Sequence, residues 1–192
     1  MKEELIIASG NKGKIKEAQE ILRDYNIIPI ENYNVQIDIE ENQSTFEGNA
    51  IKKAETIAQI LEGKKCIADD SGIEIEYLNG FPGVQTKRWF NGTDRERNLE
   101  ILNKLEGVSK EKRNVKFVCA IAISDGKNTI SAVAEIQGKI AEEVRGENGF
   151  GFDEIFELPG GRTLAELSSK EKNEISARKK ALEILRMKII SI

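Results

Sequence analysis

Two adjacent carboxylates follow a short apolar run in the segment IADDSG, residues 67–72. We expect a buried strand to end at Asp69 and Asp70, where two like charges raise each other's pKa unless cations or hydrogen-bond donors compensate. A divalent cation held by carboxylate oxygens would relieve this repulsion. The alternative is an Asx turn that closes the strand without any chemistry. Glu40 and Glu41, just before a predicted helix, can add an oxygen ligand or lie on the solvated surface.

A glycine-containing turn between an apolar run and a predicted helix is the second candidate. Its sequence is SGNKGK, which comprises Ser9, Gly10, Asn11, Lys12, Gly13 and Lys14. A helix start offers unpaired N–H groups and the positive end of the dipole, so this turn is suited to bind an anion such as phosphate. It lacks the Walker A spacing, and a surface turn with solvated lysines is the alternative. Lys52 and Lys53, about two turns into the next predicted helix, can face the same cleft.

Two later segments add a flat surface and further cations. The loop NGFGFDEIF, residues 148–156, separates its phenylalanines by glycine and acid rather than by a helix or strand period. Such a loop can stack on a planar ring while its backbone hydrogen-bonds the ring edge, although loops also bury phenylalanines simply as anchors. Lys172 and Arg178 come together around a predicted helix start, where a basic, solvated helix face is the alternative.

The sequence contains no histidine. Serine–histidine triads, proton transfer by imidazole and histidine-ligated zinc are therefore excluded. The two scattered cysteines, Cys66 and Cys119, cannot build a thiolate metal site, and we expect buried free thiols in a reducing cytoplasm. Any metal must be held by oxygen ligands, which points to Mg2+, with Mn2+ as a substitute.

Composition also limits the partners. The chain of 192 residues has a net charge of −4 and no basic stripe with interleaved aromatic residues, so nucleic acid is not expected as a main partner. Its apolar runs are too short to span a membrane, and its N-terminus shows no signal-peptide core. We therefore expect a cytoplasmic protein that does not associate with membranes.

Predicted strands and helices are mixed along the chain, which favours an α/β fold in one domain, residues 1–192. The predicted strands are Leu5–Ala8, Cys66–Ala68, Ile73–Ile75, Val115–Ile123 and Thr129–Ile136. Both faces of Val115–Ile123 are apolar, and the turn at 124–127 predicts a hairpin, which makes the sheet mixed. One predicted helix follows the turn at Ser9–Lys14. A second runs from Ser44 to Leu61 and opens with a capping box of Ser44 and Glu47, and a third opens with Thr93 and Glu96 and carries leucines 99, 102 and 105. A last helical region runs from Ser168 to Ile190 with a break near Ser176.

Taken together and in order, these segments resemble the inosine/xanthosine triphosphate pyrophosphatase family, also described as Ham1-like. The similar segments are Ser9–Lys14, the Glu41 region, TFEGNAIKKA, IADDSGIEI, GFPGV, NGFGFDEIF and AELSSKEKNEISAR. The resemblance extends from about Ile6 to Leu182. It implies an elongated mixed β-sheet flanked by helices, two lobes around a central nucleotide cleft, and a homodimer.

The resemblance also implies a reaction: hydrolysis of ITP, dITP or XTP between the α and β phosphates, with Mg2+, to a nucleoside monophosphate and pyrophosphate. It assigns the triphosphate to Ser9–Lys14 with the intervening backbone and to Lys53. Glu41 and Asp70 would bind the metal, and Asp70 would also orient or deprotonate the attacking water. Ser71 would contact substrate and Asp69 would support the site, although the sequence does not separate the roles of the two aspartates. Base recognition would fall to Phe150, Gly151, Phe152, Asp153, Lys172 and Arg178.

Charge and one departure from the family pattern bear on this assignment. A triphosphate carries about four negative charges, and Mg2+ with the lysines and Arg178 can balance them. The family usually has a Ser-His-Arg triplet, whereas this chain has Ser176, Ala177 and Arg178. Loss of the imidazole removes a donor or a stacking surface, so the preferred base stays open. Two alternatives remain: a house-cleaning pyrophosphatase of modified pyrimidine or other altered nucleotides, and a nucleotide-binding protein that does not hydrolyse its ligand.

Overall fold

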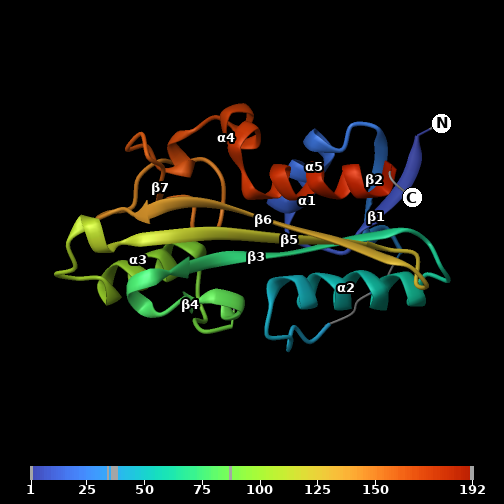
Figure 1. Cartoon of the computed structure of the whole chain (residues 1–192), viewed down its shortest axis with the longest axis horizontal. Coiled ribbons are helices and arrows are strands. Elements are labelled where there is room, and N and C mark those ends of the chain that lie inside the picture. The colour runs from blue at the N-terminus through green and yellow to red at the C-terminus, as the bar shows by residue number, and fades with distance from the viewer. Residues whose placement is uncertain (1, 34, 36–38, 87, 191–192) are drawn as a thin grey trace. The chain divides into compact units, whose positions relative to one another are not determined.

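The computed structural model describes residues 2–33, 35, 39–86 and 88–190, and Figure 1 labels its helices and strands. The strands are β1 (Glu3–Ile7), β2 (Tyr25–Pro29), β3 (Cys66–Ile75), β4 (Phe81–Pro82), β5 (Asn114–Ser124), β6 (Thr129–Ile140) and β7 (Phe156–Glu157). The α-helices are α1 (Lys12–Ile21), α2 (Phe46–Ile60), α3 (Asp94–Lys104), α4 (Ser169–Ile175) and α5 (Ala177–Ile190).

The strands form a mixed sheet in the order β2-β1-β3-β5-β6-β7, with β4 paired to β3. β1 is parallel to both of its neighbours, and Ile6 lies opposite Ile28 in β2 and Cys66 in β3. The pairs β3–β4 and β6–β7 are antiparallel. The α/β class and the mixed sheet flanked by helices, predicted from the sequence, are confirmed.

The chain divides into two compact units. Unit 1 comprises Met1–Asp70, Cys119–Ala134 and Arg178–Ile192, and unit 2 comprises Ser71–Val118 and Glu135–Ala177. Strands β3, β5 and β6 each contribute residues to both units.

In unit 1, α1 and α5 cover one face of the strands and α2 covers the other (Figure 1). Successive side chains of a strand point to opposite faces, and consecutive buried residues in β1 and β3 show that these strands are buried on both sides. Ile6 and Cys66 pack against Ile57 and Ala58 of α2. On the other face, Ile7, Ile67 and Ile121 surround a small cavity together with Ala18 of α1 and Leu182 of α5. Residues 118–122 of β5 are all buried, as the two apolar faces of its sequence predicted.

Helix α3 of unit 2 begins as predicted, with a complete capping box between Thr93 and Glu96. Its buried side differs from the prediction, because Ile101 and Leu105 are fully buried whereas Leu99 is 44% exposed. The buried residues of this helix are Arg97, Asn98 and Ile101, followed by Leu105, so its buried side includes two polar positions that the leucine pattern did not indicate. Helices α4 and α5 are separated at Ser176, which confirms the predicted break.

Strand β3 corrects the prediction most strongly. It runs without interruption from Cys66 to Ile75, so the prediction of two strands and a turn at residues 69–72 was wrong. Both readings of the acidic pair, as a strand end and as an Asx turn, fail with it. The segment stays extended because cationic side chains from the flanking helices meet both carboxylates inside the strand.

Smaller differences concern caps and short strands. The N-cap of α2 is Thr45, whose hydroxyl accepts the Gly48 N–H at 3.0 Å, so the predicted capping box at Ser44 was wrong. Glu47 instead accepts a hydrogen bond from the Ser131 hydroxyl at 2.6 Å. The strands β2, β4 and β7 were not predicted.

Both cysteines are buried free thiols, and burial raises the pKa of Cys66 to about 11 and that of Cys119 to about 12. Neither is therefore a reactive thiolate near neutral pH. Within the part of the chain that the structure describes, no helix combines the length and the apolar character needed to cross a bilayer.

Candidate active site

Asp69 and Asp70 lie on opposite faces of β3, because neighbouring residues of a strand alternate between its two faces. Asp69 faces α1 and α5, and Asp70 faces α2. Both side chains are buried, at 6% and 7% exposure. Different side chains make the close contacts with the two carboxylates, so the structure separates two environments that the sequence could not distinguish.

The Asp69 carboxylate is held between two cations. Its Oδ2 atom lies 2.9 Å from Lys14 Nζ of α1 and accepts a hydrogen bond from Arg178 Nη2 of α5, also at 2.9 Å. The other terminal nitrogen of Arg178 donates to the Glu17 carboxylate of α1. Burial by itself raises the pKa of Asp69, but the charges of Lys14 and Arg178 outweigh it and hold that pKa well below its usual range. Asp69 thus stays ionised near neutral pH and links the two helices.

The Asp70 carboxylate has a weaker compensation. Asn49 Nδ2 of α2 donates to its Oδ2 at 2.9 Å, and Lys53 Nζ of the same helix lies 3.9 Å from its Oδ1. Lys53 makes shorter contacts with Glu41 Oε1 and with the backbone oxygen of Asp69, both at 2.7 Å. Burial raises the pKa of Asp70, the Lys53 charge lowers it and the Glu41 charge raises it again, so that the pKa stays above its ordinary value. A buried carboxylate with a raised pKa is typical of a group that exchanges protons.

Glu41 and Asp70 provide the donor set that a magnesium ion needs. The same ammonium group, Lys53 Nζ, lies 2.7 Å from one carboxylate and 3.9 Å from the other, so their oxygens converge on one cationic position. Among the described residues, no cluster of three or more acidic or sulfur side chains could hold a metal alone. Mg2+ is commonly bound through one or two carboxylates, with water and substrate phosphates as its other ligands. The residues present therefore fit this ion.

In the turn at Ser9–Lys14, side chains of the turn itself accept hydrogen bonds from backbone N–H groups that the sequence predicted to be unpaired. Asn11 caps α1, and its Oδ1 accepts the N–H groups of Gly13 at 2.9 Å and Lys14 at 3.2 Å. The hydroxyl of Ser9 accepts the Asn11 N–H at 3.2 Å. The expectation that these helix-start N–H groups are unpaired was therefore wrong for Gly13 and Lys14. Lys14 is buried and directed at Asp69, whereas Lys12 and Gly10 are exposed.

A second group of predicted residues comes together in unit 2. Asp153, which is 1% exposed, accepts hydrogen bonds at Oδ2 from the Phe150 N–H at 2.8 Å and from Lys172 Nζ at 2.7 Å. The Lys172 ammonium also lies 4.5 Å from the centre of the Phe150 ring. A side chain at Gly149, where φ is +84°, would meet Asp153 Oδ2 at 2.1 Å, so this tight loop requires glycine. Ring, carboxylate and ammonium thus form one packed unit.

The remaining predicted residues have simpler positions. Phe152 is buried at 4% exposure and serves as an anchor, while Phe150 is only half-buried and can offer its ring. Ser71 is half-buried in β3, directly after Asp70. Lys52 is turned to the loop before α2, where it donates to the Glu40 carbonyl at 2.7 Å. Ala177 is almost fully buried at the start of α5.

Sequence reasoning missed two residues that hold these groups. Asn49 lies one turn before Lys53 on α2 and is fully buried, and its Oδ1 also accepts the Gln43 N–H at 3.0 Å. Glu17 lies one turn after Lys14 on α1 and is 8% exposed. In both helices a polar residue stands three or four positions from a candidate lysine, on the buried side. That spacing is the signal that could have found them.

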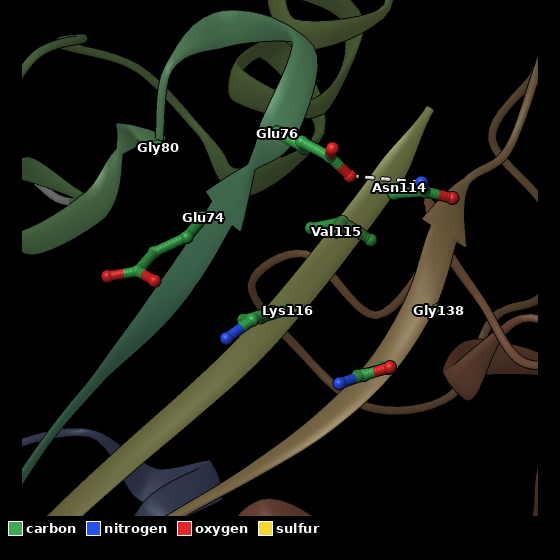
Figure 2. Close-up of a pocket in the computed structure, with 8 residues that line it drawn as sticks. Glu74, Glu76, Gly80, Asn114, Val115, Lys116 and Gly138 are labelled. Carbon is green, nitrogen blue, oxygen red and sulfur yellow. Dashed lines mark hydrogen bonds between the residues drawn. The ribbon is translucent and has the colours of Figure 1, made fainter. Parts of the chain in front are cut away.

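A hollow of about 440 Å3 lies elsewhere in unit 2, over β3, β5 and β6 (Figure 2). Glu74, Lys116 and Gly138 are among its lining residues, and Asn114 donates to Glu76 Oε2 at 3.0 Å across it. None of the predicted site residues is among the described residues that line it.

Comparisons with known proteins show the family of this chain. Residues 5–188 match the Ham1 family. The chain is 45% identical to the dITP/XTP pyrophosphatase of Bacillus subtilis (strain 168), covering 95% of this chain and 94% of the relative. It is 41% identical to the dITP/XTP pyrophosphatase of Clostridium perfringens (strain 13 / Type A), covering 94% of each protein.

Solved structures give the same result. The Ham1 protein of Staphylococcus aureus aligns over 98% of this chain and 99% of its own, with a TM-score of 0.86 and 39% identity. A HAM1 protein from Coxiella burnetii aligns over 99% of this chain and 100% of its own, with a TM-score of 0.86 and 41% identity. On its sequence and its fold, this chain belongs to the Ham1 family.

Proposed function

We propose that this chain is a nucleoside triphosphate pyrophosphohydrolase that removes deaminated purine nucleotides, namely ITP, dITP and XTP. Relatives over 40% identical along nearly their whole length bear the name dITP/XTP pyrophosphatase, which supports this substrate class. The observation that carries the proposal is the environment of Asp70, a buried carboxylate of raised pKa beside Glu41 and Lys53. Such a group can take a proton from water next to a metal-bound polyphosphate.

Charge supports a requirement for a divalent cation. Around Asp69 and Asp70 the structure gathers four carboxylates and three cations, namely Glu17, Glu41, Asp69 and Asp70 with Lys14, Lys53 and Arg178. These side chains largely compensate one another, so their surplus charge is negative and would repel a polyphosphate. Glu41 and Asp70 would hold Mg2+, or Mn2+ in its place, and the ion would supply positive charge that stabilises the phosphate oxygens.

The hydrolytic step can be assigned to atoms of this chain. A water molecule attacks the α phosphorus, and the bond from that phosphorus to the oxygen bridging it to the β phosphorus breaks. The bonding electrons leave with pyrophosphate, and the proton of the water moves to the Asp70 carboxylate. Asn49 keeps Oδ2 of that carboxylate oriented, and Lys53 with the Ser9–Lys14 turn would hold the triphosphate while Ser71 contacts the substrate.

Recognition of the base would fall to Phe150–Asp153, Lys172 and Arg178. The half-buried Phe150 ring offers a stacking surface, and the ammonium group 4.5 Å from its centre can donate to a 6-oxo group. Adenine has an amine at that position, so such a donor would reject it. Guanine shares the oxo group and would be refused only by shape or by a missing acceptor for its 2-amino group.

Two further properties belong to the proposal. The resemblance supports a homodimer that works in the cytoplasm, and the acidic net charge of −4 speaks against nucleic acid as a main partner. Size-exclusion chromatography with light scattering would measure the number of subunits directly.

We expect pyrophosphate release from dITP and XTP with Mg2+, and none after chelation of the metal. With dUTP and 5-methyl-dCTP in the same assay, kcat/KM should be lower by about a hundredfold, since pyrimidines lack the bicyclic ring. Release from the pyrimidine nucleotides alone would support the pyrophosphatase of other altered nucleotides. Tight binding of dITP without pyrophosphate release would support the non-hydrolysing alternative.

We expect Ala177→His to increase base discrimination. A histidine next to Ser176 would restore a donor or a stacking surface, and one added hydrogen bond would raise the ratio of kcat/KM for ITP over GTP by about tenfold. Because Ala177 is 1% exposed, the larger side chain must be checked for overpacking by thermal unfolding. An unchanged ratio in a folded variant would mean that this position does not select the base.

A further inference from the structure

The loop that carries Phe150 and Asp153 is held from a helix that the proposed mechanism does not use. Gly151, at the centre of this loop, has φ +65°. Its N–H donates to Asp94 Oδ2 at 2.8 Å, and its carbonyl accepts from Asn98 Nδ2 at 3.0 Å. Asp94 and Asn98 are four residues apart on α3, so one side of a single helix holds both backbone groups of one glycine.

Each of the two α3 side chains is itself fixed. The other oxygen of Asp94, Oδ1, accepts a hydrogen bond from Arg97 Nη1 at 2.6 Å, which orients the carboxylate towards the loop. Asn98 is fully buried, and its Nδ2 also donates to Glu154 Oε2 at 3.1 Å, one residue beyond Asp153. The capping box of α3 fixes the first turn of the helix, from which Asp94 projects.

Burial of the Asn98 amide costs folding free energy unless the hydrogen bonds that it donates compensate for this cost. Within the described part of the chain, its Oδ1 atom is buried and has no hydrogen-bond partner. A leucine of similar size would avoid this loss, because apolar replacements leave no polar atom unsatisfied. The presence of asparagine therefore indicates that its contacts with the loop are what the position requires.

The arrangement limits how the loop can recognise a ligand. Gly151 directs both backbone groups to α3, and the Phe150 N–H is bound to Asp153. The N–H and carbonyl of Gly151 and the N–H of Phe150 are therefore engaged within the protein. What this loop can offer is the Phe150 ring with the Lys172 ammonium beside it, and their value depends on a fixed geometry.

We propose that Asp94 and Asn98 are positioning residues, which hold the loop at residues 148–153 in one conformation and thereby set its selectivity for the base. The second part of this inference rests on the proposed function. A loop released from α3 would still be tethered by Asp153, but the Phe150 ring would adopt several orientations, and substrates that differ only in the base would be distinguished less well.

The first test measures the loop without any substrate. We expect hydrogen–deuterium exchange of peptides covering residues 148–156 to be about tenfold faster in Asp94→Ala and Asn98→Leu than in the wild type. Asp94→Asn, which keeps an oxygen acceptor, should restore most of the protection. Glu100→Ala serves as the matched control, since the Glu100 side chain is 36% exposed and, among the described residues, contacts Lys104 and Asn103 of its own helix. Unchanged exchange in both loop variants would overturn the proposal.

The second test separates positioning from general stability. We expect the ratio of kcat/KM for dITP over dGTP to fall by about tenfold in Asp94→Ala and Asn98→Leu. Inhibition by inorganic tripolyphosphate, which has no base, should stay unchanged, as should the ratio in Glu100→Ala. Faster hydrogen–deuterium exchange of the loop with an unchanged kcat/KM ratio would show that Asp94 and Asn98 do not set selectivity for the base. A wild type that releases no pyrophosphate would contradict the proposed function, while the exchange experiment would still decide whether α3 holds the loop.

Discussion

Asp70→Asn is expected to lower kcat for dITP by about a thousandfold, which is within the range for loss of a general base. The amide cannot accept the proton of the attacking water and is a weaker ligand for Mg2+. The variant should stay folded, because its Oδ1 can still accept the Asn49 hydrogen bond and Lys53 keeps Glu41 as a partner. The measurement is pyrophosphate release under saturating substrate and Mg2+, together with urea unfolding.

The expected stability of this variant has a defined sign. Since burial raises the pKa of Asp70 above its value in the unfolded chain, its ionised form is a cost to folding near neutral pH. Removal of that charge should leave the free energy of unfolding unchanged or slightly higher. Asp24→Asn, at an exposed aspartate that pairs with Arg186, controls for the loss of a carboxylate elsewhere in unit 1. Wild-type turnover by Asp70→Asn would exclude Asp70 from the chemistry.

In contrast to Asp70→Asn, the variant Asp69→Asn is expected to show a large decrease in the free energy of unfolding. The change removes the carboxylate that pairs with both Lys14 and Arg178, which are buried, and breaking a buried pair on one side costs about 3–5 kcal/mol. Urea unfolding at pH 7 measures this difference. The control Asp24→Asn breaks an aspartate–arginine pair whose side chains are 70% and 61% exposed, and it should cost no more than about 1 kcal/mol. Equal costs in the two variants would contradict the structural role of Asp69.

The pH dependence of the stability difference between wild type and Asp69→Asn provides a second check. The pKa of Asp69 is depressed in the folded protein, whereas an unperturbed aspartate titrates at about 3.9. Its stabilising contribution is therefore complete above the unfolded value and is lost as the pH falls from about 4 towards the folded pKa. The stability difference between wild type and Asp69→Asn should be constant near neutral pH and should shrink below about pH 4. A difference that grows on acidification would contradict this sign.

Strand β3 shows where local reasoning failed. The run IADDSG has the composition of a turn, since aspartate, serine and glycine all favour turns. Within the fold this preference is overridden, because Lys14 and Arg178 on one face and Asn49 and Lys53 on the other meet the two carboxylates. These partners come from three helices far apart in the sequence, and no local window contains them.

Helix α3 was predictable from the sequence only in part. The capping box at Thr93 was predictable because Thr93 and Glu96 lie within one turn. The buried stripe of α3 was not, since Asn98 is fully buried while Leu99 is 44% exposed. Hydrophobicity alone favours the leucine, and only the contact of Asn98 with the Gly151 loop explains the asparagine.

The sequence by itself determined the α/β class, the mixed sheet, the free thiols, the exclusion of histidine chemistry and the family, because these depend on composition, periodicity and the order of short segments. Only the tertiary structure separated the environments of the two aspartates. The pKa of a buried carboxylate depends on which charges lie within a few ångströms, and that is a property of packing. Asp69 meets two cations and stays ionised, whereas Asp70, one residue later and on the opposite face, shares one lysine with Glu41 and can exchange a proton.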